Sequence, residues 1–269
     1  MKKNHNVTLI LGIIITSIVF LFFIIGFFYT PYDPNEMMVG PKCTPPSFKH
    51  FMGTDNFGRD IFSRILEGSR STTIIALCTV LLGSVIGTLI GALTGYFGGF
   101  IDTALMHIND SLTAIPSMLI ALVIVGILGG GKYNIILALG ILFIPSYARV
   151  TRTCFASLKD AQYVQNAKLM GVKTPRILFM HILPNTLSVI LPTLTIGFSN
   201  AVLSEASMSY LGIGVKPPEA SLGYMLSEAQ SILKIAPWYA LNTGFVIVLI
   251  VFGVGLLGDG LSKQNNGEY

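Results

Sequence analysis

The sequence is poor in charge, with 17 Lys and Arg and 13 Asp and Glu residues among 269, or 11%. A typical soluble domain has roughly 25% charged residues, and its surface needs that charge to stay dispersed in water. The hydrophobic share is instead 52%, and the mean hydropathy is +0.70. These values exclude a soluble globular domain and a disordered chain. They favour a protein that crosses a membrane several times.

Residues that support chemistry are also scarce. Three cysteines (Cys43, Cys78 and Cys154) cannot form a disulfide framework, and the sequence has no H-x3-H or C-x2-C spacing for a resident metal. The net charge of +4 is scattered, so no nucleic-acid surface is predicted. A G-x4-G-K match at 126–132 is followed by Tyr133, where a nucleotide-binding loop needs Ser or Thr. We therefore expect no enzymatic activity, no catalytic residues, no metal and no cofactor in this chain.

Long apolar runs without alternation predict membrane-spanning helices, because a lipid-exposed chain must satisfy its own backbone hydrogen bonds. The first run would be about 33 Å long as a helix, enough to cross a hydrocarbon core. Six runs are present, at 7–28, 72–96, 101–128, 133–148, 186–204 and 235–257. They predict an all-α membrane protein whose two termini lie on the same side. Lys and Arg near the span ends narrowly favour the cytoplasm for both termini.

Two polar segments are too long for simple turns, and long loops in compact proteins usually carry function. Residues 30–71 begin as an extended, proline-rich stretch. Residues 149–184 indicate a helix, a turn and a second helix. Gly171 is suited to end the first helix, and Thr174 followed by Pro175 is suited to begin the second.

Particular residues within the spans suggest packing or transport roles. Glycines at 83, 87, 91 and 95 share one helix face and predict close packing of a neighbouring helix, with pore lining as the alternative. Asp110 and Glu205 are functional candidates because acids within spans are costly. His107 shares a helix face with Asp110. For these two, the alternative is a place near the membrane interface, with hydrogen bonds inside the bundle.

Four blocks resemble motifs of one family. Residues 163–171, followed after nine residues by 181–185 (HILPN), resemble the cytoplasmic E-A-A-x3-G-x9-I-x-L-P signature of ABC-importer permeases. Residues 50–64 resemble a G-T-D-x-x-G-R-D-x-x-S-R block, and residues 205–218 an E-A-S-L-S-F-L-G-L-G-x-x-P-P block. Asp110 with 114–116 (AIP) matches a fourth. The blocks cover the chain in family order and resemble the dipeptide, oligopeptide and nickel branch.

The resemblance implies a type I ABC importer permease fold with six transmembrane helices in the cytoplasmic (inner) membrane. Residues 1–70 would form an N-terminal helix and an extracytoplasmic loop, 71–262 a core of five transmembrane helices, and 263–269 a cytoplasmic tail. The implied partners are a second, homologous permease, two ATPase subunits that bind ATP and Mg²⁺, a substrate-binding protein outside, and membrane lipid.

The resemblance also implies roles for individual residues. A cytoplasmic coupling helix near 161–171 would dock into the ATPase, with Ala167 and Gly171 offering a small surface. Three groups of site residues follow: Gln165, Asn166, Ala167, Gly171, His181, Leu183 and Pro184 for coupling; Gly53, Thr54, Asp55, Gly58, Arg59 and Asp60 for the outer face that meets the binding protein; and His107, Asp110 and Glu205 for the pathway. The sequence departs from the family at Gln165 and Asn166, which replace Glu and Ala and remove any ion pair of that Glu, and at His107, which replaces a frequent Arg.

These observations predict that the chain forms half of a translocation pathway for peptides, nickel or a metal–chelator complex. The alternatives are a stand-alone secondary carrier for small polar solutes and a membrane scaffold that transports nothing. Neither alternative needs the helix–glycine–helix insert at 149–184, because neither docks an ATPase. Cargo specificity in the family rests largely on the separate binding protein.

Overall fold

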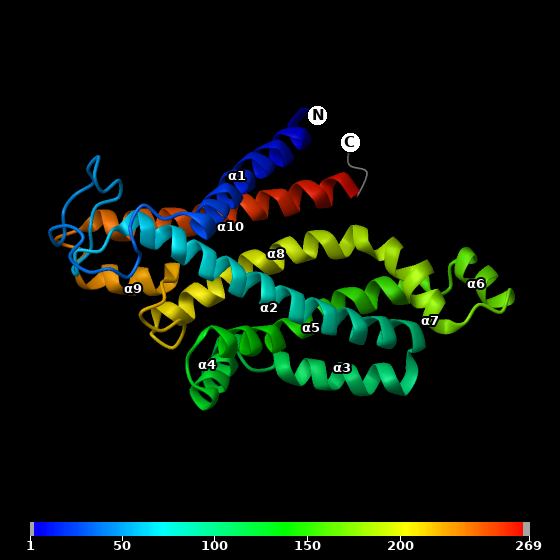
Figure 1. Ribbon diagram of the computed structural model, residues 1–269. Coiled ribbons are helices and arrows are strands. Elements are labelled where there is room, and N and C mark those ends of the chain that lie inside the picture. The colour runs from blue at the N-terminus through cyan, green and yellow to red at the C-terminus, as the bar shows by residue number, and fades with distance from the viewer. Residues whose placement is uncertain (1–2, 266–269) are drawn as a thin grey trace.

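The computed structural model describes residues 3–265, which form helices joined by turns, with no strand (Figure 1). The long elements are helices that run side by side, and the short ones lie at the two ends of the bundle. In chain order they are α1 Lys3–Phe28, α2 Ile61–Phe97, α3 Gly99–Thr113, α4 Ser117–Leu128, α5 Lys132–Leu158, α6 Gln162–Leu169, α7 Thr174–Arg176, the π-helix η1 Ile177–Ile182, α8 Leu183–Tyr210, α9 Leu222–Ser231 and α10 Pro237–Asn265.

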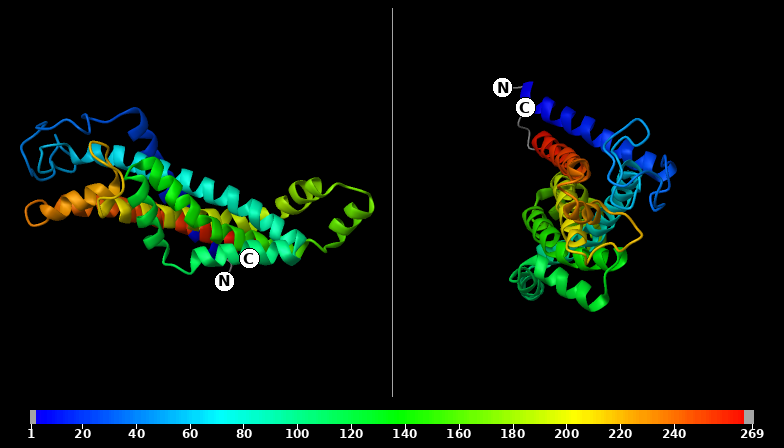
Figure 2. Two further views of the ribbon diagram at one scale, coloured as in Figure 1. Left: turned by 90° about the horizontal axis from the view of Figure 1, so that it is seen from below. Right: turned by 90° about the vertical axis from the view of Figure 1, so that its left-hand side faces the viewer.

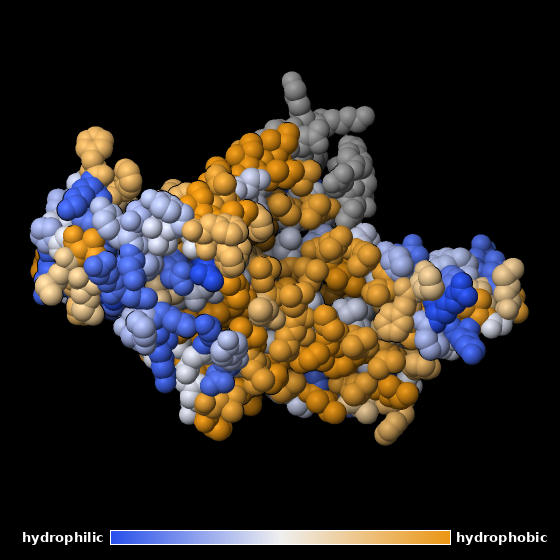
Figure 3. Space-filling model, in the orientation of Figure 1, coloured by the Kyte–Doolittle hydropathy of each residue, from blue (hydrophilic) through white to orange (hydrophobic). Residues whose placement is uncertain are grey.

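Five of these stretches are long and apolar enough to cross a membrane: α1, α2, α5, α8 with the short helices before it, and α10. Helices α3 and α4 together make a sixth candidate span, bent by 84°. Counted with the bent pair, six spans agree with the prediction. The surface shows an apolar band between two polar ends, as a membrane protein requires (Figure 3).

The third predicted span, 101–128, is not one straight helix. Pro116 lies at the bend, between the end of α3 at Thr113 and the start of α4 at Ser117. Proline has no N–H to donate and disfavours helical geometry at the residue before it. The apolar run alone did not predict this break.

Helix α5 continues past the predicted end at Ala148 to Leu158 and takes two arginines with it. Both arginines pair with acids of α3. Arg152 bonds to both carboxylate oxygens of Asp102, at 2.5 and 2.6 Å, and Arg149 Nη2 lies 2.9 Å from Asp110 Oδ1. Two arginines predicted to lie beyond the span therefore belong to the same helix as the span.

Helix α2 begins at Ile61, well before the predicted start at 72, because Asp60 caps it by accepting from the Ser63 N–H at 2.8 Å. The expected division between residues 70 and 71 therefore lies inside α2.

The glycines of α2 pack against α5. A methyl group on Gly87 would lie 2.7 Å from both the Ile144 carbonyl oxygen and Tyr147 Cβ. One on Gly95 would lie 2.5 Å from the Arg152 carbonyl oxygen. Such distances leave no room for a side chain. Packing within the chain is thus confirmed, and the alternative of pore lining is wrong.

Helices α1 and α10 run antiparallel and close together. Gly12 faces the backbone of Leu257, and Gly260 faces Leu9. The start of α1 and the end of α10 lie side by side in all views (Figures 1 and 2), as an even number of spans requires. Most of the predicted tail at 263–269 lies outside the described residues.

The two ends of the bundle differ, and we name them by their short helices. The α6 end comprises residues 159–182, and the α9 end comprises the loop 29–60 together with α9 (Figure 1). A core of apolar side chains from α2, α8, α9 and α10 fills the α9 end, and a smaller cluster fixes α6 against η1. The functional candidates lie at these ends and in a cavity between them.

Candidate functional sites

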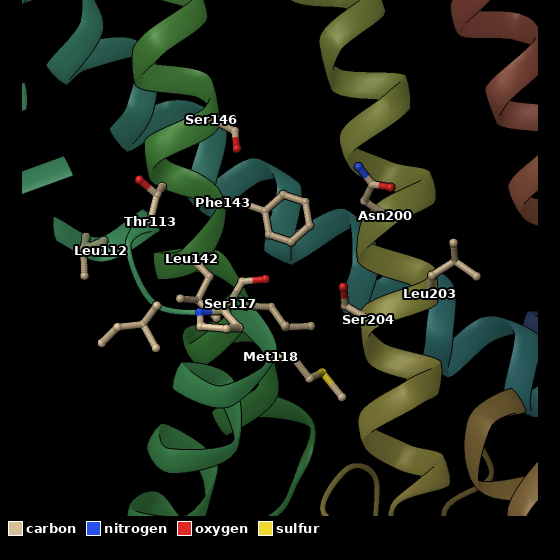
Figure 4. Close-up of a pocket in the computed structure, with 13 residues that line it drawn as sticks. Leu112, Thr113, Ser117, Met118, Leu142, Phe143, Ser146, Asn200, Leu203 and Ser204 are labelled. Atoms are coloured by element: carbon tan, nitrogen blue, oxygen red, sulfur yellow. The ribbon is translucent and has the colours of Figure 1, made fainter. Parts of the chain in front are cut away.

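A cavity of about 500 Å³ opens where the bend between α3 and α4 faces α5 and α8. Because Pro116 turns α4 away from the line of α3, these four helices do not close on one another. The lining residues are Leu112, Thr113, Ile115, Pro116, Ser117, Met118, Leu139, Leu142, Phe143, Ser146, Asn200, Leu203 and Ser204. Figure 4 shows Asn200 and Ser204 on α8 across from Ser146 and Phe143 on α5.

The chemistry of this cavity is neutral and hydrogen-bonding. All of its described lining residues are uncharged, and five of them (Thr113, Ser117, Ser146, Asn200 and Ser204) have hydroxyl or amide groups. Such groups both donate and accept hydrogen bonds. The surrounding leucines, Met118 and Phe143 supply apolar contact. The arrangement is suited to a ligand that is itself rich in amides. The sequence analysis did not predict this site; the available signal was Asn200, an amide inside a predicted span.

The three pathway candidates lie outside this lining. His107 is exposed on α3. Asp110 forms the ion pair with Arg149. Glu205 is fully buried, and its Oε1 accepts from the Ser209 hydroxyl at 2.7 Å. The structure therefore brings His107 and Asp110 to one helix and places Glu205 in the packed core of the α9 end.

The helix predicted near 161–171 is present as α6, and Gly171 follows its end as expected. Gly171 has φ +75°, its N–H donates to the Lys168 carbonyl, and the Val172 N–H donates to the Ala167 carbonyl, both at 3.0 Å. These two bonds with a left-handed glycine form a Schellman motif.

Ala167 requires a correction. Its side chain is buried, and with Val164 it packs in the cluster that fixes α6 against η1, which includes Phe155, Ile177 and Ile182. It therefore lets α6 approach η1 closely and does not join Gly171 in an outward surface. Gln165 and Asn166 do face outward.

The segment after α6 differs from the prediction at its first residue. Lys173, with extended backbone, caps α7 through its carbonyl, which accepts from Arg176 and Ile177, and Thr174 lies inside the helix. The chain then continues as the π-helix η1, in which hydrogen bonds span five residues; the Leu183 N–H, for example, donates to the Leu178 carbonyl.

The remaining coupling candidates lie in this π-helical turn and at the start of α8. The His181 ring lies 3.1 Å from the Arg176 carbonyl, and Leu183 and Pro184 begin α8. The most exposed apolar side chains of the α6 end are Leu169, at 86%, and Met170, at 85%. The motif pattern did not single out either residue.

The outer-face candidates are buried, and they shape the loop at the α9 end. Asp55 Oδ1 accepts from the N–H groups of Phe57 and Arg59, at 2.8 and 2.9 Å, around Gly58 at φ +75°. Asp60 Oδ1 lies within hydrogen-bond distance of His50 Nδ1, at 2.8 Å, and Asp60 Oδ2 caps α2. Thr54 is fully buried, and Gly53 at φ +80° leaves no space for a side chain beside Trp238.

Glu228 of α9 completes this site and was missed in the sequence. Its two oxygens accept from Arg59 at 2.8 Å, from Arg64 at 3.1 Å and from the Tyr239 hydroxyl at 3.0 Å. Burial by itself would lower the pKa of Arg59, but the hydrogen bonds and charges of Glu228 and Asp55 outweigh it and raise that pKa. The available signal was that Glu228 is the only acid between 220 and 258.

This cluster ties four segments together: the loop, α2, α9 and α10. Its members face inward, and the loop instead exposes other residues, such as Phe48, which is 100% exposed.

Known proteins are similar to this chain in sequence or in fold. The family described as binding-protein-dependent transport system inner membrane component matches residues 87–265. The dipeptide transport system permease protein DppC of Haemophilus influenzae is 38% identical over 266 residues, which cover 97% of this chain and 90% of that protein. The glutathione transport system permease protein GsiD of Escherichia coli is 38% identical over 261 residues, covering 97% of this chain and 85% of that protein.

A solved structure of the MetNI methionine ABC transporter in an inward-facing conformation superposes with a TM-score of 0.62 at 18% identity. The match covers 75% of this chain and 96% of that chain, and it shows the type I ABC importer permease fold. Since the family match spans most of the sequence and the relatives align along nearly all of it, the chain belongs to the binding-protein-dependent inner membrane component family, as a multi-pass ABC-importer permease of the dipeptide and oligopeptide branch.

Proposed function

We propose that this permease carries short peptides inward, driven by ATP that separate subunits hydrolyse. A second, homologous permease completes the pathway, two ATPases hold ATP and Mg²⁺, and a substrate-binding protein delivers the peptide at the α9 end. The α6 end and both termini face the cytoplasm. This chain contributes no catalytic group and holds no cofactor.

The uncharged, hydrogen-bonding cavity carries the proposal. A peptide offers amide donors and acceptors to Ser117, Ser146, Asn200 and Ser204. A nickel ion prefers imidazole, thiolate or carboxylate ligands, and the described lining supplies none of these. The dipeptide and glutathione permeases among the relatives support the same choice over nickel or a metal–chelator complex.

Uptake into proteoliposomes tests this function. The permease is reconstituted with its partner permease, ATPases and binding protein, with ATP on the ATPase side. We expect a labelled dipeptide to accumulate only with ATP, and nickel not to accumulate. Nickel uptake without peptide uptake would assign the metal as cargo. Uptake by this chain alone, driven by an ion gradient, would establish the secondary carrier.

The exposed pair Leu169 and Met170 gives a prediction for coupling. We expect Leu169→Asp with Met170→Asp to abolish co-purification of the ATPase, because two charges would have to be buried in an apolar contact. The measurement is the amount of ATPase retained by the affinity-purified permease.

Matched variants separate contact from folding. Leu233→Asp, at an exposed leucine between α9 and α10, should leave the ATPase bound. Ala167→Asp should lose the ATPase together with thermal stability, because Ala167 is buried. If the Leu169 and Met170 double variant still retains its ATPase and still transports, the coupling surface lies elsewhere.

A further inference from the structure

An exposed ion pair lies one helical turn beyond the cavity. Asp110 precedes the lining residue Thr113 by three positions on α3, and Arg149 follows the lining residue Ser146 by three positions on α5. Three helical residues span about 4.5 Å. Since α3 and α5 run in opposite directions, both charges lie on the same side of the cavity, towards the α6 end. Figure 4 shows Thr113 and Ser146 at this margin.

This pair is unlike a structural ion pair. Arg149 is 57% and Asp110 60% exposed, and they share one contact of 2.9 Å. The neighbouring pair between the same two helices, Arg152 and Asp102, is bidentate and less exposed. That bidentate pair already joins α3 to α5 near their α6-end termini, so the helices do not depend on the exposed pair for their packing.

The position of the exposed pair requires a polar environment. Arg149 lies about 25 Å along α5 from its first residue, near the inner edge of a hydrocarbon core about 30 Å thick. A half-exposed pair turned to lipid at this depth would be costly. Water in the pathway, or a polar ligand moving through it, removes that cost.

We propose that Asp110 and Arg149 form a charged exit subsite, which receives the two ends of a short peptide as it leaves the neutral cavity. The inference rests on the proposed function. Arg149 binds the peptide carboxylate in the planar, two-bond geometry that guanidinium favours, and Asp110 binds the peptide ammonium. At rest each group neutralises the other, and on arrival of a zwitterion one ion pair is exchanged for two.

A short peptide can bridge the two charged groups only when their ion pair opens. An extended dipeptide spans at most about 7 Å, so the 2.9 Å pair must open for both ends to bind. The cavity supplies neutral groups to the peptide bond while the exit supplies the charges. A peptide thus meets no charged side chain among the described residues that line the cavity, and it meets both signs together at the exit.

The test is dipeptide uptake by the complete importer carrying Asp110→Asn with Arg149→Gln. We expect the uptake rate per complex to fall roughly tenfold, which corresponds to about 1.4 kcal/mol, with the thermal stability of the complex unchanged. The matched control is Lys132→Gln with Glu219→Gln. It removes another exposed pair, at 39% and 48%, outside the cavity, and should retain wild-type uptake.

A charge reversal distinguishes binding from bridging. Asp110→Arg with Arg149→Asp restores an ion pair between the helices but presents the charges in the opposite order. We expect uptake to stay low. Wild-type uptake by the reversed importer, or loss of the partner permease from the neutralised one, would overturn the subsite in favour of a bridge or a subunit contact. Equal uptake by all variants would also overturn it, whereas a wild-type importer that takes up no dipeptide would instead overturn the proposed function.

Discussion

Replacing Gly91 with alanine is expected to lower the unfolding temperature of the purified permease by about 2–12 °C. A methyl group on Gly91 would overlap the Ala148 carbonyl oxygen and would lie 2.7 Å from Thr151 Cβ and 2.8 Å from the Arg152 nitrogen. Two of these atoms are backbone, so no side-chain rotation relieves the overlap. Overpacking of this kind costs about 1–3 kcal/mol, and 1 kcal/mol shifts the unfolding temperature of a chain of this size by about 2–4 °C. Thermal unfolding in detergent measures the change.

Gly255 supplies the matched control. It lies inside α10, and a methyl group there would meet nothing within 4 Å. Gly255→Ala should therefore keep or slightly raise stability, because alanine loses less conformational freedom than glycine in a helix. Equal destabilisation by the two variants would show that the cost is general to helical glycines. A neutral Gly91→Ala would show that α2 and α5 are not in close contact.

The α2–α5 contact matters for transport because α5 forms one wall of the cavity. Leu139, Leu142, Phe143 and Ser146 all line it from α5, and α2 supports that helix from behind. A shift of α5 away from α2 would narrow the cavity from one side. Loss of uptake in Gly91→Ala should therefore accompany its loss of stability.

Local patterns predicted much of this fold. The recurrence of glycine at every fourth residue predicted the face of α2 that packs against another helix, and Gly171 predicted the end of α6. Both depend only on residues within a few turns of one another. The bend at Pro116 was missed because the apolar run around it continues, and hydropathy does not register a lost backbone donor.

Long-range pairing limited the remaining predictions. The predicted span ended before Arg149 and Arg152 because their acidic partners lie 39 and 50 positions away. Ala167 was assigned to the wrong face because a small apolar residue suits either a docking surface or a packed interior. The G-T-D-x-x-G-R-D block was recognised, yet the carboxylate that pairs with both of its arginines, Glu228, lies 169 positions from Arg59. Spacing within a motif carries no information about such a partner.

The second large expected effect is the loss of stability when Glu228 is replaced. Glu228→Gln is expected to lower the free energy of unfolding by about 3–5 kcal/mol, the usual cost of breaking a buried ion pair from one side. Glu228 is only 11% exposed; it is the one carboxylate that pairs with Arg64 among the described residues, and it shares the charge of Arg59 with Asp55. A glutamine keeps the shape but offers one acceptor oxygen in place of two, and it turns an amide donor towards a guanidinium. The unfolding temperature should fall by about 6–20 °C.

Glu219→Gln is the control for Glu228→Gln, because it removes an exposed pair worth less than about 1 kcal/mol. If the two variants unfold alike, the Glu228 cluster does not hold the α9 end together. The location of the damage gives a second measurement. The α6 end lies at the far side of the bundle (Figure 1), so Glu228→Gln at permissive temperature should still co-purify its ATPase. It should lose peptide uptake, because the loop proposed to receive the binding protein would no longer be held against α2 and α9.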